Sequence, residues 1–432
     1  MSDAAVAGTD PDNRVLDLTI DEATLSQPIP QRLRVDSIDL LRGLVMVIML
    51  LDHTREFVHH DAVNFQNPTN LQTTTPILFF TRWITHFCAP IFVFLAGTGA
   101  YFQLSRGKSK RELSRFLITR GLWLILLELT LVRLGIFFNV NYSLMALLQV
   151  IWVIGLSMIG LSVLIYLPVR WLAVFGLAMI FLHNLLDRFV VPQWQGPESP
   201  VPSWSAKLFM ILHQEGVFPV LWFFPSPVVI LAYPAIPWIG VMALGFAFGA
   251  LYEIDSERRR RLLIRIGIVS IGLFVLLRAV NVYGDLFKWS VQRTATYTFL
   301  SFMNVTKYPP SLLYLLATLG PAMIFLALAE RTSRGWLSRS LIVFGRVPLF
   351  YYLLQWYVAH GLAVLLGLVA LQPVAWQFMN FNERFGTQPP NTGFRLWVVY
   401  VLWISGVLLL YPLCKWYADV KRRRNDWWLS YL

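Results

Sequence analysis

Charge is scarce in this sequence. Lys, Arg, Asp and Glu make up 14% of its 432 residues, whereas 56% are hydrophobic and 15% are aromatic. A soluble chain of this length would need far more charge to cover its surface. The alternating segments of a membrane β-barrel are also missing, because apolar residues form continuous runs of about 20 residues, the length that crosses ~30 Å of hydrocarbon. The chain is therefore predicted to be an all-α polytopic membrane protein.

Cysteine and nucleotide-binding motifs are equally sparse. Cys88 and Cys414 both lie inside apolar segments, so they indicate neither a disulfide framework nor a zinc site. No G-x-x-x-x-G-K-S/T loop occurs, which disfavours ATP-driven transport. We interpret the glycines of the apolar segments as helix-packing residues, namely Gly97, Gly99, Gly240, Gly245 and Gly249.

Acidic residues are outnumbered, with 24 Asp and Glu against 36 Lys and Arg, which gives a net charge of +12. Such an excess can indicate a nucleic-acid-binding protein. Here, however, the basic residues cluster in short connections between the apolar runs, as they do in the cytoplasmic loops of membrane proteins. We therefore expect the lipid bilayer as a partner of the chain, and no nucleic acid.

Ten membrane spans are predicted, with both termini in the cytoplasm. This count places all the basic connections on one side of the membrane, and they are residues 106–115, 257–265, 330–339 and 421–424. The apolar segment 216–227 is short and interrupted by prolines, so it is predicted to re-enter the membrane, to lie at the interface or to form half of an eleventh span. The spans are roughly 38–59, 76–104, 114–138, 144–167, 170–190, 228–252, 262–282, 311–330, 340–371 and 394–418.

The composition divides the chain into three parts. Residues 1–31 are polar and acidic and are predicted to form a disordered tail. Residues 32–420 are predicted to form one transmembrane domain, and residues 421–432 a basic cytoplasmic tail. Neither an internal repeat nor a pair of inverted halves, which would favour a transporter, is visible in the sequence.

Two ionisable residues, Asp52 and His53, lie near the far end of the first predicted span. Ionisable groups inside a membrane are costly and usually functional, and histidine is the usual general base near neutral pH. Arg42 lies eleven residues before His53, ~16 Å away along a helix and on nearly the same face. This spacing suits an elongated donor that enters from the inside and a base that serves an acceptor from the outside. For Arg42 alone, a positive-inside anchor paired with Asp39 is the simpler explanation.

Further histidines gather at the level of His53. His86 lies near the outer start of the second predicted span, and His59 and His60 follow the first. A histidine cluster invites a metal interpretation, but no pair combines regular helical spacing with a carboxylate as third ligand. We therefore predict no metal and favour interfacial or hydrogen-bonded histidines.

Polar residues inside or beside other spans have two interpretations. Glu128 and Arg133 lie five residues apart in the third span, so each is predicted to pair with another helix. Two further groups flank one outer loop, where acceptor binding and ordinary helix-end hydrogen bonding explain them equally well. They comprise Arg278, Asn281, Tyr283 and Asp285 before the loop, and Lys307, Tyr308 and Ser311 after it.

The spacing from Arg42 to His53 resembles the arginine–histidine motif of the membrane acyltransferase-3 proteins. The wider sequence resembles more closely the bacterial relatives of the heparan-α-glucosaminide N-acetyltransferase catalytic domain, over about residues 34–365. The segments that carry this resemblance are SIDLLRGLVMVIMLLDH (37–53), RWITHFCAPIFVFLAGTGAY (82–101), FLITRGLWLILLELT (116–130), YPAIPWIGVMALGFAFG (233–249), NVYGD (281–285) and TKYPPSLLYLLATLGP (306–321).

The resemblance implies acyl transfer across a membrane, from cytoplasmic acetyl-CoA to a sugar hydroxyl or amine on the other side. It places His53 at the first-helix histidine of the family and Arg42 at its arginine. His53 would act as a general base or as a transient acyl carrier. The family also implies a second polar site in the following loop. A family histidine corresponds to Gln355 of this chain, and His360 is a candidate to replace it.

We therefore predict an acyl-CoA-dependent O- or N-acetyltransferase of a bacterial inner membrane. Its acceptor would be a glycan or an amino sugar, and the sequence leaves homodimer formation open. A transporter or flippase for a glycan or small polar solute, without covalent chemistry, is the alternative. The assigned residues are His53, Asp52 and Arg42 for catalysis, Arg42, Asp39 and Arg120 for acetyl-CoA, and His59, His60, His86, Arg278, Asp285, Lys307 and Tyr308 for the acceptor.

Overall fold

The structure is a computed structural model that describes residues 35–221, 226–331, 335–384, 392–424 and 426–431. The predicted tail, residues 1–31, lies outside the described residues. By their contacts, residues 1–35 and residues 36–432 form separate units. Everything described below belongs to the second unit.

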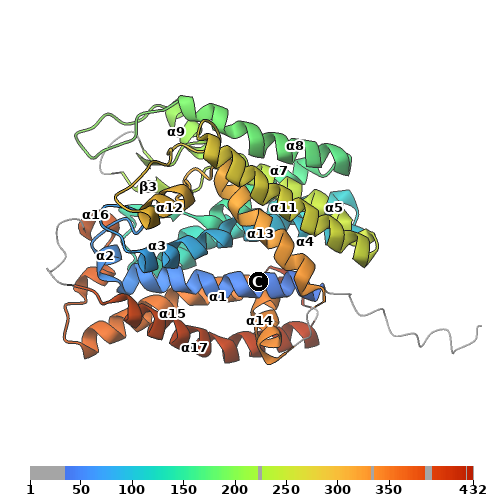
Figure 1. The fold of residues 1–432 in the computed structure, drawn as a ribbon. Helices are drawn as coiled ribbons and strands as arrows, with labels where there is room; N and C mark the ends of the chain where they lie inside the picture. Colours follow the sequence, from blue (N-terminus) through green and yellow to red (C-terminus); the bar gives the residue numbers. More distant parts are fainter. Residues whose placement is uncertain (1–34, 222–225, 332–334, 385–391, 425, 432) are drawn as a thin grey trace, which may run out of the picture. The chain divides into compact units, whose positions relative to one another are not determined.

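Helices dominate this unit, and each of the ten predicted spans coincides with at least one of them (Figure 1). The α-helices are α1 Asp36–Val58, α2 His60–Val63, α3 Pro76–Trp83, α4 Cys88–Ser105, α5 Lys110–Leu127, α6 Arg133–Phe137, α7 Val150–Leu164, α8 Val169–Leu182, α9 Trp204–Leu212, α10 Ala235–Gly249, α11 Ser256–Val280, α12 Ala295–Met303, α13 Leu312–Ala329, α14 Trp336–Arg346, α15 Pro348–Val369, α16 Phe381–Arg384 and α17 Leu396–Arg423. Shorter helical turns are η2 Ile84–Phe87, η3 Glu128–Val132, η4 His183–Arg188, η5 Ala250–Glu253, η6 Ala375–Phe378 and η7 Trp427–Ser430.

Seven helical segments of the described chain are long and apolar enough to cross a membrane. This confirms a multi-pass helical membrane protein, while the count of ten spans and the cytoplasmic termini stay predictions. Helix α1 is not among the seven, although it has 23 residues, because it carries several charges. The seven are Pro76–Ser105, Val169–Arg188, Ala235–Glu253, Ser256–Val280, Leu312–Ala329, Pro348–Val369 and Leu396–Arg423.

A small sheet departs from the all-α prediction. Strands β1 (Leu144–Leu148), β3 (Val228–Leu231) and β2 (Gly216–Pro219) lie in that order, with β1 and β3 parallel and β2 and β3 antiparallel. Two predicted spans, 144–167 and 228–252, therefore begin with a strand, and the segment predicted to re-enter contributes another. Short apolar runs of this kind do not distinguish a strand from a helix by their periodicity.

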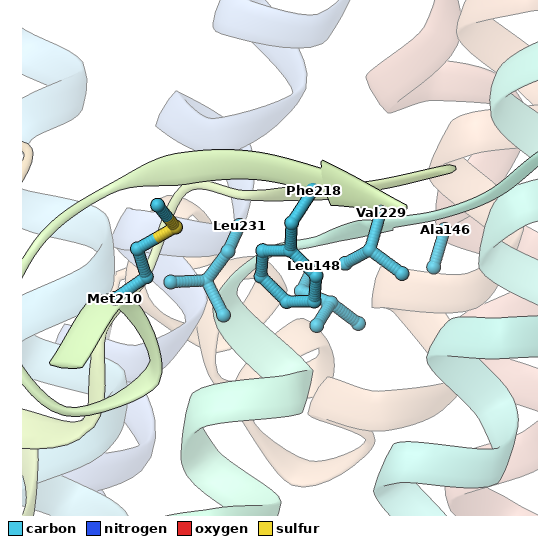
Figure 2. Packing of buried hydrophobic residues seen from close by; sticks show 6 residues of the cluster. All are labelled: Ala146, Leu148, Met210, Phe218, Val229 and Leu231. Atoms are coloured by element: carbon cyan, nitrogen blue, oxygen red, sulfur yellow. The ribbon is translucent and has the colours of Figure 1, made fainter. Parts of the chain in front are cut away.

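The sheet has its own apolar core. Ala146 of β1 pairs with Val229 of β3, and Val217 of β2 pairs with Ile230. Figure 2 shows the side chains that gather on one side of the strands and against α9, namely Ala146, Leu148, Met210, Phe218, Val229 and Leu231. This packing fixes the connection from β1 into α7, which matters for the site described below.

One predicted span is broken. Residues 340–371 form α14 and α15, which meet at Val347. Pro348 explains the break, because it has no N–H to continue the hydrogen-bond ladder and it disfavours helical geometry at the residue before it. As the first residue of α15 it is well placed, since the first helical position needs no donor.

Helix α1 packs against α14, α15, α17, α4 and α13. Its crossing with α14 is backbone against backbone. A Cβ on Gly43 would lie 1.8 Å from the Leu341 carbonyl oxygen, and a Cβ on Gly345 would lie 1.8 Å from the Asp39 carbonyl oxygen. Only glycine fits at these two positions, so they fix where the Arg42 end of α1 meets α14.

Helices α4 and α10 are in similarly close contact, which bears on the glycines interpreted as packing residues. A Cβ on Gly97 would lie 2.0 Å from the Met242 carbonyl oxygen, and one on Gly245 would lie 2.0 Å from that of Phe94. The interpretation is confirmed for these two, but it is wrong for Gly99, whose Cβ would meet nothing within 4 Å. Gly99 instead lines a cavity.

Candidate functional site: two cavities beside a histidine

The C-terminal part of α1, which is predicted to face the outside, carries a buried cluster of ion pairs. Asp52 accepts a hydrogen bond from Nη2 of Arg55 at 3.1 Å, and its other oxygen accepts from Nη1 of Arg82 in α3. Arg82 also donates to Oγ1 of Thr85 at 3.1 Å. The side chains of Asp52 and Arg55 are 8% and 4% exposed, so both charges depend on each other. Asp52 thus ties α1 to α3.

His53 has other partners. Its Nδ1 lies 3.4 Å from Oε2 of Glu56, one turn further along α1. Its ring lies against the indole of Trp356 in α15, with 3.6 Å between ring centroids. Neither neighbour was predicted from the sequence. The i, i+3 spacing from His53 to Glu56 is a visible signal, whereas no local pattern indicates Trp356.

A cavity of about 300 Å³ lies toward the Arg42 end of α1, and we call it the basic cavity. Three basic residues line it, Arg42, Arg120 and Lys421, and two of them were predicted to bind acetyl-CoA. The third such prediction, Asp39, forms an ion pair with Arg42 at 3.1 Å. The remaining wall is mostly apolar and includes Met46, Phe92, Leu95, Gly99, Leu124, Ile151, Ile154, Met158, Leu349 and Tyr352.

A second cavity, of about 350 Å³, lies toward the other end of α1, and we call it the aromatic cavity. Its polar lining consists of Glu56, Gln149 and Arg384. Burial lowers the pKa of Arg384 to about 10, which leaves it charged at neutral pH. Its apolar lining is Phe57, Ala62, Val63, Phe65, Ile136, Leu147, Ile230, Trp356 and Phe381. The cavity thus combines aromatic walls with one group of each charge.

Neighbouring residues of α15 and of the start of α7 line the two cavities. On α15, Tyr352 lines the basic cavity and Trp356, one turn later, lines the aromatic cavity, with 6.3 Å between their ring centroids. At the start of α7, Val150 lines the basic cavity and its neighbour Gln149 lines the aromatic one. We call these four residues the dividing layer. His53 contacts this layer through Trp356.

Glu128 holds one side of the dividing layer in place. It sits in the π-helical turn η3, 1% exposed, and its carboxylate accepts hydrogen bonds from the backbone N–H groups of Gln149 at 3.0 Å and Trp152 at 3.3 Å. A carboxylate at a helix N-terminus satisfies orphan donors and complements the helix dipole. The predicted pairing of Glu128 with another helix is therefore confirmed.

Arg133 pairs differently from the prediction. Its guanidinium donates to carbonyl oxygens of the connection that follows its own helix, at Asn139 (2.7 Å) and Leu144 (3.1 Å), and to Oδ1 of Asn380 (3.2 Å). These partners lie in a loop, in β1 and just before α16, not on another spanning helix. The arginine therefore anchors the chain that leads into the sheet.

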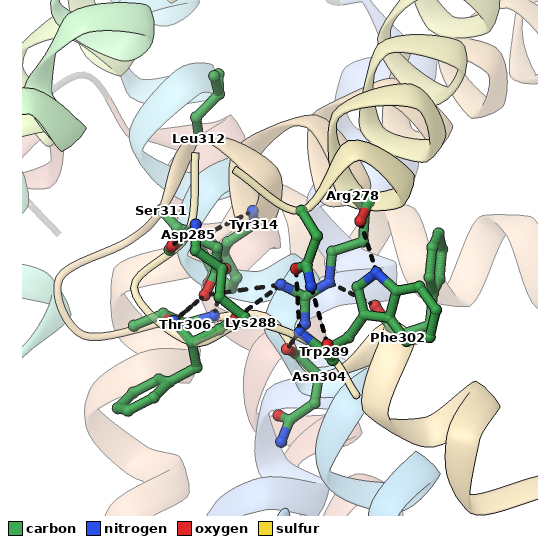
Figure 3. A network of polar contacts seen from close by, with 12 residues as sticks. Arg278, Asp285, Lys288, Trp289, Phe302, Asn304, Thr306, Ser311, Leu312 and Tyr314 are labelled. Atoms are coloured by element: carbon green, nitrogen blue, oxygen red, sulfur yellow. Dashed lines mark hydrogen bonds and ion pairs between the residues drawn. The ribbon is translucent and has the colours of Figure 1, made fainter. Parts of the chain in front are cut away.

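The two polar groups around the predicted outer loop do meet (Figure 3). Asp285 accepts hydrogen bonds from Oγ1 of Thr306 at 2.6 Å and from Oγ of Ser311 at 2.7 Å. Arg278 donates to four backbone carbonyls, those of Phe302, Phe287, Ser301 and Asn304, at 2.6–3.0 Å. Arg278 and Asp285 are 1% and 5% exposed, so they close the loop from inside. Their assignment to the acceptor stays a prediction.

The remaining acceptor candidates divide into two places. Lys307 and Tyr308 lie near the Asp52–Arg82 pair, with the Lys307 ammonium 5.2 Å from the centroid of the Tyr308 ring. His86 is 3% exposed in η2, and its ring packs against Tyr314. The other two candidates, His59 and His60, follow the end of α1.

Gln355, the residue at the family histidine, is fully buried on α15. Neither atom of its amide has a hydrogen-bond partner among the described residues. His360, the suggested replacement, directs Nδ1 to the Gly135 carbonyl oxygen at 3.1 Å and stacks between Phe57 and Phe138. His360 is therefore used in helix packing.

These features define a polytopic helical membrane protein with a buried, histidine-containing charged centre and two cavities that residues of α1 line. The chain matches the family model described as heparan-alpha-glucosaminide N-acetyltransferase, catalytic, over residues 34–276, and it belongs to that family. Membership identifies it as a member of a membrane acetyltransferase family. The resemblance is confirmed over the matched range, while the segments 281–285 and 306–321 lie beyond it. No curated protein matches the chain.

Proposed function

We propose that the protein transfers an acetyl group from acetyl-CoA, bound in the basic cavity, to a sugar hydroxyl or amine, bound in the aromatic cavity. One observation carries this proposal: His53 contacts the layer that divides the two cavities, 3.6 Å from Trp356. A base at that place can serve a reaction in which the donor and the acceptor approach from opposite sides. The family membership supports the acetyl donor.

The basic cavity suits the donor by charge and by size. Arg42, Arg120 and Lys421 supply three positive charges, and guanidinium and ammonium groups are the usual protein ligands of phosphates. A volume of about 300 Å³ accommodates an acyl-pantetheine arm but not a whole nucleotide. The phosphates of CoA would therefore stay at the basic residues while the thioester reaches toward Tyr352.

The aromatic cavity suits a sugar ring. Aromatic side chains such as Trp356 and Phe381 offer apolar faces to the C–H groups of a sugar, and Glu56 and Gln149 offer hydrogen-bond partners for its hydroxyls or amine. The few polar groups on a mostly apolar wall are typical of small-molecule sites.

The chemistry assigns one proton route. A proton on Nδ1 of His53, directed to Glu56, leaves Nε2 as the base. Nε2 takes the proton of the acceptor as its oxygen or nitrogen attacks the thioester carbonyl. The new C–O or C–N bond forms, the C–S bond breaks, and the imidazolium returns the proton to the CoA thiolate. A positioned base of this kind typically contributes ~10² to 10⁴-fold. Transfer through an acetyl-His53 intermediate would use the same residue.

The test is acetyl-CoA binding and slow hydrolysis by the purified chain in detergent. We expect wild type and His53→Ala to bind acetyl-CoA equally, and only wild type to release free CoA. Arg120→Ala should weaken binding, whereas Arg339→Ala, which changes an exposed arginine of α14, should not. Monodisperse wild-type protein that binds no acetyl-CoA would refute the proposal and favour the transporter or flippase, which needs none.

A further inference from the structure

Three potential metal ligands meet directly after α1. His59, His60 and Asp61 each offer one nitrogen or oxygen atom, and these atoms all lie within 4.8 Å of one another. From the sequence no metal was predicted, because no histidine pair combines regular helical spacing with a carboxylate as third ligand. The three residues converge instead because His59 is extended, with φ −74° and ψ 131°, and α2 begins at His60.

A distant segment fixes this turn. The N–H of His60 donates to the Phe394 carbonyl oxygen at 3.1 Å, and the N–H of Phe394 donates to the Val58 carbonyl oxygen at 2.8 Å. Gly393 makes the approach close, because a Cβ there would lie 2.6 Å from the Cα of His60. Its φ of +96° also favours glycine. The ligand backbone is thus held by two segments, as a preformed site requires.

His59 contributes a buried nitrogen in need of a partner. Its side chain is 4% exposed, and Nδ1 has no hydrogen-bond partner among the described residues. The nearest oxygen of Asp61 lies 3.9 Å away, beyond hydrogen-bond range. Buried polar atoms in proteins are nearly always satisfied, so a buried nitrogen without a partner among the described residues is a candidate metal ligand.

His60 and Asp61 face each other at a distance that a shared cation would suit. Nδ1 of His60 lies 3.4 Å from the Phe394 carbonyl oxygen, which can only accept, so the tautomer with its proton on Nδ1 satisfies that carbonyl. Nε2 then presents a lone pair to Oδ1 of Asp61 at 2.8 Å. Two acceptors at that distance need either a second proton or a metal ion between them. A histidine that donates one nitrogen to a carbonyl and offers the other is typical of metal ligands.

We propose that His59, His60 and Asp61 bind one divalent transition-metal ion of the Zn²⁺ class. Two imidazoles and a carboxylate are suitable ligands for this class, and a three-ligand site leaves a coordination position for water or for an oxygen of another molecule. Ligand atoms in a tetrahedral site lie ~3.3 Å apart. The three ligand atoms, now within 4.8 Å of one another, can reach this spacing by a movement of the His60 side chain, which is 54% exposed. The neighbouring Ala62 and Val63 line the aromatic cavity, so the ion would lie beside it.

The experiment titrates untagged full-length protein in detergent, after treatment with a chelator, with Zn²⁺ by calorimetry and with Co²⁺ by visible absorption. We expect one ion per chain, with the absorption of four-coordinate Co²⁺. His60→Ala and Asp61→Asn should each weaken binding at least tenfold. His213→Gln is the matched control, because His213 and Asp187 form another histidine–aspartate pair, at 2.9 Å, that belongs to no three-ligand group among the described residues.

Wild-type protein that binds no stoichiometric ion would overturn the proposal, as would wild-type affinity in both His60→Ala and Asp61→Asn. Loss of binding in the His213→Gln control would do the same. The exposed His60 variant keeps the test decisive if the buried His59 variant misfolds, and size-exclusion profiles identify misfolded protein. The readout needs no acetyl-CoA, so its failure is distinguishable from failure of the proposed function.

Discussion

Replacing Asp52 with asparagine should be among the most destabilising single changes in α1. The substitution keeps the shape of the side chain but removes the charge that faces Arg55 and Arg82. Arg82, 12% exposed, would then lose its ion-pair partner, and Arg55, 4% exposed, would keep only the more distant Glu56 at 3.7 Å. Removal of one partner from a buried ion pair typically costs about 3–5 kcal/mol of the free energy of unfolding.

The size of this loss of stability follows from the burial of the Asp52 ion pairs. An ion pair on the protein surface provides the comparison. Asp419 and Arg422 form an ion pair at 3.1 Å, the same length as the Asp52–Arg55 contact, but their side chains are 40% and 70% exposed. Exposed pairs contribute at most about 1 kcal/mol, because water screens them. Asp419→Asn should therefore change the free energy of unfolding by less than about 1 kcal/mol.

The assay is reversible unfolding in mixed micelles, followed by tryptophan fluorescence, for Asp52→Asn, Arg82→Gln and the double variant. Because the two residues contact each other, the double variant should lose less stability than the sum of the single losses. Equal losses for Asp52→Asn and Asp419→Asn would refute the reasoning. Strict additivity would show that Asp52 and Arg82 do not depend on each other.

Three further changes test the site and its scaffold. Glu56→Gln should lower acetyl-CoA turnover about tenfold or more without changing acetyl-CoA binding, because the carboxylate orients His53; equal turnover in a steady-state assay would contradict this role. Trp356→Ala should open the dividing layer and raise acetyl-CoA hydrolysis measured without acceptor as thiol release; unchanged release would mean that another residue divides the cavities. Gly345→Ala should prevent folding, because its Cβ would lie 1.8 Å from the Asp39 carbonyl oxygen; a normal yield of monodisperse protein would show that α14 can move away.

The sequence predicted the helices well because membrane spans depend on length and apolarity, which are local properties. The prediction was wrong where short apolar segments next to a helix form strands instead. LMALL and VVIL were included in spans but form β1 and β3, and periodicity cannot separate such runs from helix. Pro348 is a residue that can interrupt a helix, but the apolar residues on both sides of it suggested one continuous span.

Only the part of the candidate site that lies on the first helix was predictable from the sequence. His53 and Arg42 stand out because ionisable residues are rare in apolar runs. Trp356 belongs to a helix from the other end of the chain, and nothing in its local sequence indicates that it contacts His53. Asp285 was found as a polar residue at a helix end, but only the fold reveals that Thr306 and Ser311 occupy its oxygens.

The thin dividing layer has an electrical consequence. Moving one elementary charge through the full membrane potential changes its energy by about 2.3 kcal/mol per 100 mV. If water fills both cavities, most of this potential falls across the layer between Tyr352 and Trp356, whose ring centroids are 6.3 Å apart. A proton that leaves the acceptor on one side and reaches the thiolate on the other would cross most of the field. Acetyl transfer in an energised membrane would then run at a rate set partly by voltage.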